Sequence, residues 1–142
     1  MPRRTLESLT WDECVALLGQ ASVGRLVYED DLGPAAVPVI YGIAGQDIVF
    51  RSEGGSKIEA LHDRTVGFEV DSIDEDTHTG WSVLARGTSR EVEFEQLPEL
   101  VRQLDGDVPI PWKKGIHLIW VTISPTSLTG RRLADFAFEG LL

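Results

Sequence analysis

The chain has 142 residues, of which 42% are apolar and 25% are charged, a composition typical of a globular protein. No apolar run approaches the roughly 18 residues of a membrane span, and the N-terminus lacks an apolar signal core, so we expect a cytoplasmic protein. Asp and Glu total 23 against 13 for Lys and Arg, a formal net charge of −10. This charge repels nucleic acid and anionic lipid, so we expect neither nucleic acid nor a membrane as a partner.

The N-terminal part reads as a loose arm over residues 1–9, followed by one short helix. Thr10 and Glu13 have the spacing of a capping box, and Gly19 is a natural end for a helix of about two turns. The only cysteine, Cys14, lies on the apolar face of this helix. A single cysteine excludes an internal disulfide, and its position predicts a buried structural thiol.

The next part of the chain alternates with a period of two and is interrupted by turn residues. This pattern predicts an antiparallel meander of three strands. Pro38 lies inside the second strand, where a central strand tolerates proline badly, so that strand is at an edge or its proline faces a ligand. The three strands are expected over residues 23–28, 35–43 and 48–52.

The second half predicts three more strands and two short helices. In the long strand the apolar residues change phase at Gly87, which indicates a bulge or bend of the kind that closes a barrel. About six strands in meander order, with short helices, favour a small, mainly β antiparallel barrel. We expect a helix over 56–63, a strand over 65–70, an acidic loop over 71–79, a strand over 80–94, a helix over 97–104, and a last strand over 116–123 that ends at Ser124 and Pro125.

One segment concentrates cationic and hydroxyl side chains on this acidic chain. It joins the third strand to the start of a helix, where unpaired amides bind anions and glycines permit close approach. These features suit a phosphate monoester, although a capped helix with surface charges explains the residues equally well. The segment is Phe50-Arg51-Ser52-Glu53-Gly54-Gly55-Ser56-Lys57.

Other residues carry weaker signals. The three histidines, His62, His78 and His117, are far apart in unlike contexts, so we expect no metal site. Trp81 and Trp112 each stand at the start of a strand or after prolines, where an aromatic ring either stacks on a planar ligand or joins the core. No nucleophile elbow or catalytic triad is indicated.

Several short stretches, taken in order, resemble a known family. The chain resembles the pyridoxamine 5′-phosphate oxidase-like flavin-binding split-barrel family, in the branch that includes nitroimidazole-resistance proteins. The ordered set is more specific than any one piece. The matching stretches are ECVALL (13–18), VGRL (23–26), PVIY (38–41), IVFRS (48–52), GSKI (55–58), FEVD (68–71) and WSVLARG (81–87), with a weaker match at ISP (123–125) and GR (130–131).

The resemblance implies a six-stranded antiparallel split barrel in which residues 1–142 form a single flavin-binding domain. It also implies a homodimer with two flavin sites at the subunit interface. The resemblance implies three groups of cofactor-binding residues. Residues that begin at Phe50 bind the phosphate, through Arg51, Ser52, Ser56 and Lys57. The backbone of Val37, Pro38, Val39 and Ile40 lies along the flavin ring, and Trp81, Ser82 and Val83 close the site.

Two departures from the family bear on cofactor and substrate. The chain lacks the C-terminal Arg/His substrate motif of true pyridoxamine phosphate oxidases, so the resemblance does not imply that substrate. Arg51 stands where the nitroimidazole-resistance branch has histidine, and it suits FMN or, as an alternative, the more anionic deazaflavin coenzyme. We expect an FMN- or deazaflavin-dependent oxidoreductase acting on an unknown small molecule. The alternatives are a non-catalytic flavin or haem carrier or sensor on the same fold, and a small barrel without cofactor that acts as an interaction module.

Overall fold

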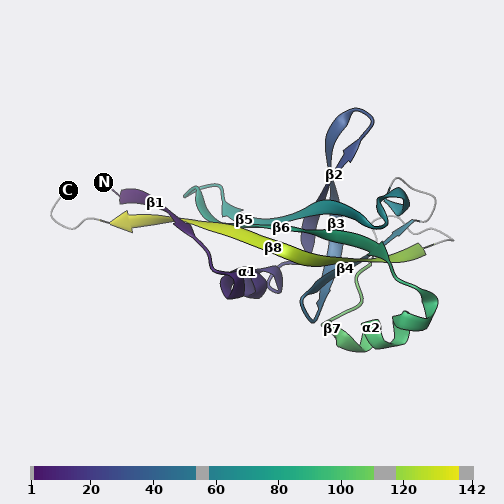
Figure 1. The fold of residues 1–142 in the computed structure, drawn as a ribbon. Helices are drawn as coiled ribbons and strands as arrows, with labels where there is room; N and C mark the ends of the chain where they lie inside the picture. Colours follow the sequence, from purple (N-terminus) through teal and green to yellow (C-terminus); the bar gives the residue numbers. More distant parts are fainter. Residues whose placement is uncertain (1, 54–57, 111–117, 138–142) are drawn as a thin grey trace.

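A computed structural model describes residues 2–53, 58–110 and 118–137 of the chain. Its main feature is a six-stranded antiparallel ring in the order β8-β4-β3-β2-β5-β6, which closes because β6 also pairs with β8. This confirms the expected split barrel (Figure 1). The ring strands are β2 (Val23–Asp30), β3 (Gly33–Ala44), β4 (Asp47–Glu53), β5 (Arg64–Asp74), β6 (Thr79–Glu91) and β8 (Leu118–Ala137).

Short elements complete the described part of the chain. None of its helices is long and apolar enough to cross a membrane. The remaining elements are β1 (Pro2–Ser8), α1 (Trp11–Leu18), the 3-10 turns η1 (Glu59–Leu61) and η2 (Phe94–Gln96), α2 (Leu97–Gln103) and β7 (Leu104–Asp105).

The barrel interior holds the apolar residues that the alternating pattern assigns to one face. Val66, Phe68 and Val70 are all buried, and the Phe68 ring packs edge-on against Tyr41 with their centres 5.1 Å apart. Helix α1 covers one side of this core, as Figure 1 shows below β8. Its capping box forms as expected, because the Thr10 hydroxyl accepts from the Glu13 amide and the Glu13 carboxylate accepts from the Thr10 amide. Cys14 is fully buried, which confirms the structural thiol.

An irregularity is present at the expected place, but the extra residue is Thr126 on β8 and not a residue of the long strand β6. The register between β6 and β8 shifts between Arg86 and Gly87, where Gly87 lies opposite Pro125. A Cβ atom on Gly87 would lie 2.1 Å from the Ser124 carbonyl oxygen. Only glycine lets the two backbones approach this closely. The expected change of phase at Gly87 is wrong, because Val83, Ala85, Gly87 and Ser89 are all buried and keep one parity along β6.

Two expectations about the chain ends are wrong. The arm expected over residues 1–9 is not loose in its described part, because residues 2–8 form β1 and pair with residues 131–137 of β8. The last strand does not end at Pro125 but continues to Ala137: Pro125 lies opposite Gly87, and pairing with β6 resumes at Ser127 after the extra residue Thr126. Both errors have one cause: the residues beyond the bulge give no clear apolar alternation, and the arm is held by backbone pairing with β8 and by a hydrogen bond from the Thr5 hydroxyl to the Ala134 carbonyl oxygen.

Three other boundaries differ from the expectation. The helix expected over 56–63 is described only as the 3-10 turn η1, since residues 54–57 lie outside the described part. The acidic segment 71–79 is largely strand, because β5 runs to Asp74 and β6 starts at Thr79. The strand expected to reach Phe94 ends at Glu91, and the Phe94 side chain is 83% exposed.

Candidate functional site

Strand β4 carries the described part of the expected phosphate site. Arg51 and Ser52 are half-buried on this strand. The Arg51 guanidinium lies over the Trp120 ring, 5.3 Å from its centre, and its Nε donates to the Pro109 carbonyl oxygen at 2.8 Å. The Phe50 side chain is fully buried, so only its backbone can face a ligand. The remaining two expected phosphate ligands, Ser56 and Lys57, lie outside the described residues.

The neighbouring strand β3 carries the residues expected along the flavin ring. Val39 is buried, Val37 and Ile40 are half-buried, and Pro38 is exposed. Within the described residues β4 pairs only with residues 41–44 of β3. Strand β2 pairs with residues 33–40 of β3. Pro38 therefore lies beyond the end of the β4 ladder, which is how this strand accommodates a proline.

The third expected group lies elsewhere on the barrel. Trp81 and Ser82 are half-buried on β6, and Val83 is fully buried in the core. The strand order places β2 and β5 between β3 and β6 in one direction, and β4 and β8 between them in the other. A single chain thus brings the β3 and β4 residues together but keeps Trp81, Ser82 and Val83 apart from them.

A charge cluster that sequence reasoning missed lies between these two groups. Arg25 Nη1 is 3.3 Å from Glu69 Oε1 and 3.3 Å from Asp71 Oδ2. In the strand register Arg25 is opposite Pro38, and Asp71 is opposite Ser82. Partial burial and the nearby Asp71 raise the pKa of Glu69 to about 7, although Arg25 acts in the opposite direction. In the sequence, Arg25 and Glu69 stand at strand positions that the alternation assigns to the outer face of the sheet. Their closeness can be predicted only when the pairing of β2 with β5 is known.

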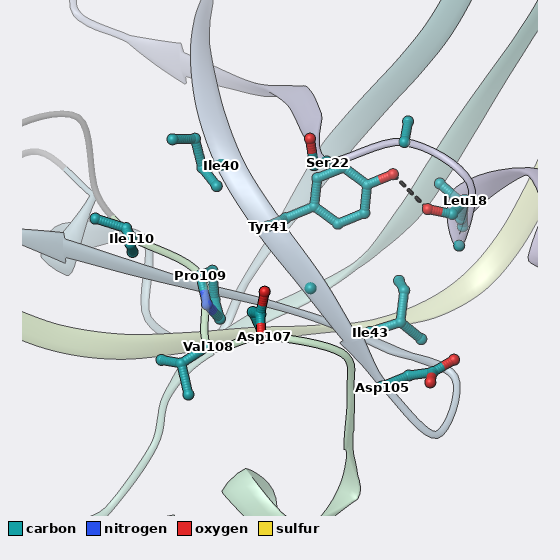
Figure 2. A pocket seen from close by; sticks show the side chains of 13 residues that line it. Leu18, Ser22, Ile40, Tyr41, Ile43, Asp105, Asp107, Val108, Pro109 and Ile110 are labelled. Atoms are coloured by element: carbon teal, nitrogen blue, oxygen red, sulfur yellow. Dashed lines mark hydrogen bonds between the residues drawn. The ribbon is translucent and has the colours of Figure 1, made fainter.

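A groove adjoins the β3 residues, and we call it the α1–β3 groove. Its volume is about 370 Å³, and it lies between the end of α1, residues 40–43 of β3 and residues 105–110 (Figure 2). The Tyr41 hydroxyl donates to the Leu18 carbonyl oxygen at the C-terminal end of α1. Burial raises the pKa of Tyr41 well above its usual range, so the phenol stays neutral at physiological pH. Residues 105–110 were not predicted to border a site.

The described residues fit a phosphorylated flavin. A guanidinium has five N–H donors, so the bond to Pro109 leaves the terminal nitrogens of Arg51 for an anion. The Ser52 hydroxyl is on the same strand, and Trp120 holds the guanidinium from one side. A half-buried cation on a chain of net charge −10 can attract an anionic group.

Comparison with known proteins identifies the family. The model for pyridoxamine 5′-phosphate oxidase matches residues 10–132, so the chain belongs to the pyridoxamine 5′-phosphate oxidase-like family, which confirms the resemblance. The structure resembles that of the FAD binding protein from Mycobacterium smegmatis, with 32% identity, a TM-score of 0.72, and coverage of 89% of this chain and 98% of that one.

Two further proteins resemble this chain, one in sequence and one in fold. The uncharacterised protein Rv0080 of Mycobacterium tuberculosis is 28% identical over 137 residues, which are 92% of this chain and 87% of that protein. A Bacteroides thetaiotaomicron protein named for 5-nitroimidazole antibiotic resistance is 12% identical, with a TM-score of 0.67 and coverage of 95% and 92%. At that identity the second likeness shows a shared fold alone.

Proposed function

We propose that this protein binds a flavin nucleotide and uses it as an FMN- or deazaflavin-dependent oxidoreductase on a small molecule. The observation that carries the proposal is the half-buried Arg51 guanidinium on β4, which lies over the Trp120 ring of the neighbouring strand β8. The relative from Mycobacterium smegmatis, which is named as an FAD binding protein, supports a flavin and adds FAD to the nucleotides to be tested.

Each group of residues has a part in this proposal. Arg51 and Ser52, with Ser56 and Lys57, bind the phosphate through charge and hydroxyl groups. The backbone from Val37 to Ile40 lies along the ring and orients it. A bound flavin supplies the redox chemistry, so the chain needs to position the flavin and exclude water but needs no acid–base residue of its own.

A homodimer is part of the proposal because one chain separates two halves of the expected site. Residues 37–40 and 50–52 lie on β3 and β4, whereas Trp81, Ser82 and Val83 lie on β6. Strand β8 separates β4 from β6 on one side, and β2 and β5 separate β3 from β6 on the other. A second copy related by a two-fold axis would place its β6 residues against the β3 and β4 residues of the first. The symmetry would then make two equivalent sites.

Flavin binding is tested by titrating the apo protein with FMN, FAD, riboflavin and a deazaflavin coenzyme, and by following flavin fluorescence. We expect the phosphorylated flavins to bind at least about tenfold more tightly than riboflavin, because only they reach Arg51. Equal affinity for riboflavin and FMN would remove the phosphate site. No binding of any of the four would overturn the proposal.

A non-catalytic flavin carrier or sensor is the second candidate, favoured by a relative that is named only for binding FAD. Anaerobic reduction of the loaded protein by a nicotinamide or a reduced deazaflavin, followed by reoxidation with candidate substrates, separates the two. An oxidoreductase is reduced and then reoxidised at catalytic rates. A carrier releases its flavin or exchanges electrons only slowly.

The shared site is tested by mixing two defective variants. Arg51→Ala and Trp81→Ala each remove one half of the site, and refolding an equal mixture makes heterodimers that contain one intact site. Binding should return to about a quarter of the sites. No recovery in the mixture, or a stable monomer by light scattering at micromolar concentration, would contradict the shared site.

A further inference from the structure

A concave surface lies on the outer face of the sheet where β1, β5, β6 and β8 run side by side, and we call it the β6–β8 bowl. Its volume is about 760 Å³, which falls within the range of ligand pockets, roughly 300–1,000 Å³. Its floor is formed by residues 82–86 of β6 and residues 129–131 of β8. The bowl is therefore large enough for a small organic molecule.

The side chains that border the bowl lie on one face of the sheet. Residues directly opposite each other on paired strands share a face. Ser82 of β6 is opposite Arg131 of β8, and the next outward position, Leu84, is opposite Thr129. Val83, between the two β6 residues, points the other way and is fully buried in the core. One ligand can therefore contact these four side chains together.

Two arginines at opposite ends of the bowl carry free positive charge. Arg86 and Arg131 are both exposed, and neither forms an ion pair with any residue that the structure describes. Arg86 lies four positions along β6 from Ser82, so strand geometry puts the Cα atoms of the two arginines roughly 14 Å apart. A guanidinium is always charged, and its planar fork matches a carboxylate or a phosphate.

The carboxylates near the bowl are occupied or turned away. Glu69 borders the bowl, but it shares the Arg25 guanidinium with Asp71, at 3.3 Å from each carboxylate. Glu7 also borders the bowl, but it is opposite Arg132 on β8, and strand alternation turns both of these side chains to the other face of the sheet. The two free arginines therefore dominate the charge that a ligand in the bowl would meet.

We propose that the β6–β8 bowl binds an organic dianion, a small molecule with an anionic group at each end and a short apolar middle. One carboxylate or phosphate lies against Arg86 and the other against Arg131. The middle packs on Leu84, and the hydroxyls of Ser82 and Thr129 donate to the anionic groups. A monoanion reaches only one guanidinium, and a dication of the same length meets two like charges.

The bowl is separate from the expected phosphate site. Arg51 lies over Trp120 near the start of β8, whereas Thr129 and Arg131 lie in the second half of this strand. The proposal therefore does not rest on the proposed function. Ser82 is the one residue in common, because it also belongs to the group expected to close the flavin site.

Four probes with one chain length test the charge preference on the full chain. Calorimetry at low salt compares adipate, hexanoate, 1,6-hexanediol and 1,6-hexanediamine, which carry two, one and no negative charges and two positive charges. We expect adipate to bind about tenfold more tightly than hexanoate, because each guanidinium adds a charge-assisted contact. The diamine should bind most weakly. Equal affinity for adipate and hexanoate, or for adipate and the diamine, would overturn the proposal.

Variants of the two arginines locate the effect. Arg86→Gln and Arg131→Gln should each bring adipate affinity down to that of hexanoate, and both residues are exposed, so the variants should fold as the wild type does. Glu69→Gln should have the opposite effect and strengthen adipate binding, because it removes a carboxylate from the wall. The control Arg102→Gln makes the same change of net charge on α2 and should change nothing. Unchanged adipate affinity in both arginine variants, or an equal loss in the control, would refute the site.

Flavin titration and light scattering of the same samples separate the two proposals. Adipate selectivity without flavin binding would leave the bowl proposal standing and remove the proposed function. Flavin binding without adipate selectivity would do the reverse. If the wild type does not bind adipate and the double variant Arg86→Gln/Arg131→Gln becomes a monomer, the bowl is a contact between subunits and the proposal is wrong.

Discussion

The Arg51 Nε atom donates a hydrogen bond of 2.8 Å to the carbonyl oxygen of Pro109, 58 residues further along the chain. The bond joins β4 to the wall of the α1–β3 groove. The same guanidinium lies over Trp120, so three segments meet at one side chain. The position of the Arg51 side chain and the position of the groove wall are therefore physically linked.

Arg51→Lys should weaken FMN binding by about tenfold and change riboflavin binding little. Lysine keeps the charge but loses the planar fork that can serve Pro109 and a phosphate together. Hydrogen exchange of the amides at 107, 108 and 110 should also become faster, because the wall loses its anchor. Arg102→Lys on α2, where the arginine is 76% exposed, is the matched control. An unchanged FMN affinity would remove Arg51 from the phosphate site.

Lys57→Ala should weaken FMN binding on the order of tenfold to a hundredfold and hardly affect riboflavin, which has the same ring without the phosphate. The measurement is fluorescence quenching with both ligands at one fixed salt concentration. Equal losses for both ligands would indicate an effect on folding or on the ring. An unchanged ratio of the two dissociation constants would mean that Lys57 is an ordinary surface residue.

Glu69→Gln should stabilise the protein at pH 8 by about 1 kcal/mol and have little effect at pH 5. The pKa of Glu69 is raised from 4.5 to about 7 on folding, so the folded state binds more protons between these values. Its contribution to stability is present below pH 4.5 and is lost as the pH rises through 7. Glutamine resembles the protonated form and avoids the repulsion with Asp71.

Urea unfolding of the wild type and of Glu69→Gln at several pH values measures this effect. Glu75→Gln, an exposed change of the same kind, should leave the pH dependence as it is. A variant less stable than the wild type at pH 8 would show that the attraction of Arg25 outweighs burial and the repulsion from Asp71.

Gly87→Ala should destabilise the fold by more than about 2 kcal/mol, because its Cβ atom would overlap the backbone of β8 at Ser124. Gly19→Ala is the comparison. A Cβ atom there makes an ordinary contact of 3.5 Å with a helix carbonyl, and the backbone is right-handed, so we expect a change within about 0.5 kcal/mol. Thermal unfolding of both variants tests this. Equal effects would mean that the bulge relaxes easily.

The sequence predicts the parts of the fold that local chemistry determines. The Thr10 and Glu13 capping box and the alternation around Phe68 each have a nearby physical cause, and each is present in the structure. The irregularity at Gly87 is also present, but its extra residue is Thr126 on the paired strand β8, which no local pattern indicates. The polar arm was missed because β1 is held by pairing with residues at the other end of the chain. No local pattern encodes such a partner.

The same difference between local and long-range causes applies to the candidate site. Arg51 stood out from the sequence because cations are few on an acidic chain. Its bond to Pro109, the grouping of Arg25 with two carboxylates, and the α1–β3 groove all depend on which distant segments the barrel brings together. They could be found only after the strand order was known.

Strand β8 pairs with β4 through its first residues, with β6 along most of its length, and with β1 near its end. On a ribosome β1 is made before β8, so β1 has no partner until residues 131–137 have emerged. The barrel likewise cannot close before that point. Such long-range pairing slows folding, and the unfinished chain exposes its strand edges meanwhile. A nascent chain truncated before residue 118 should therefore be a target for chaperones and proteases, whereas the finished chain should fold in one cooperative step.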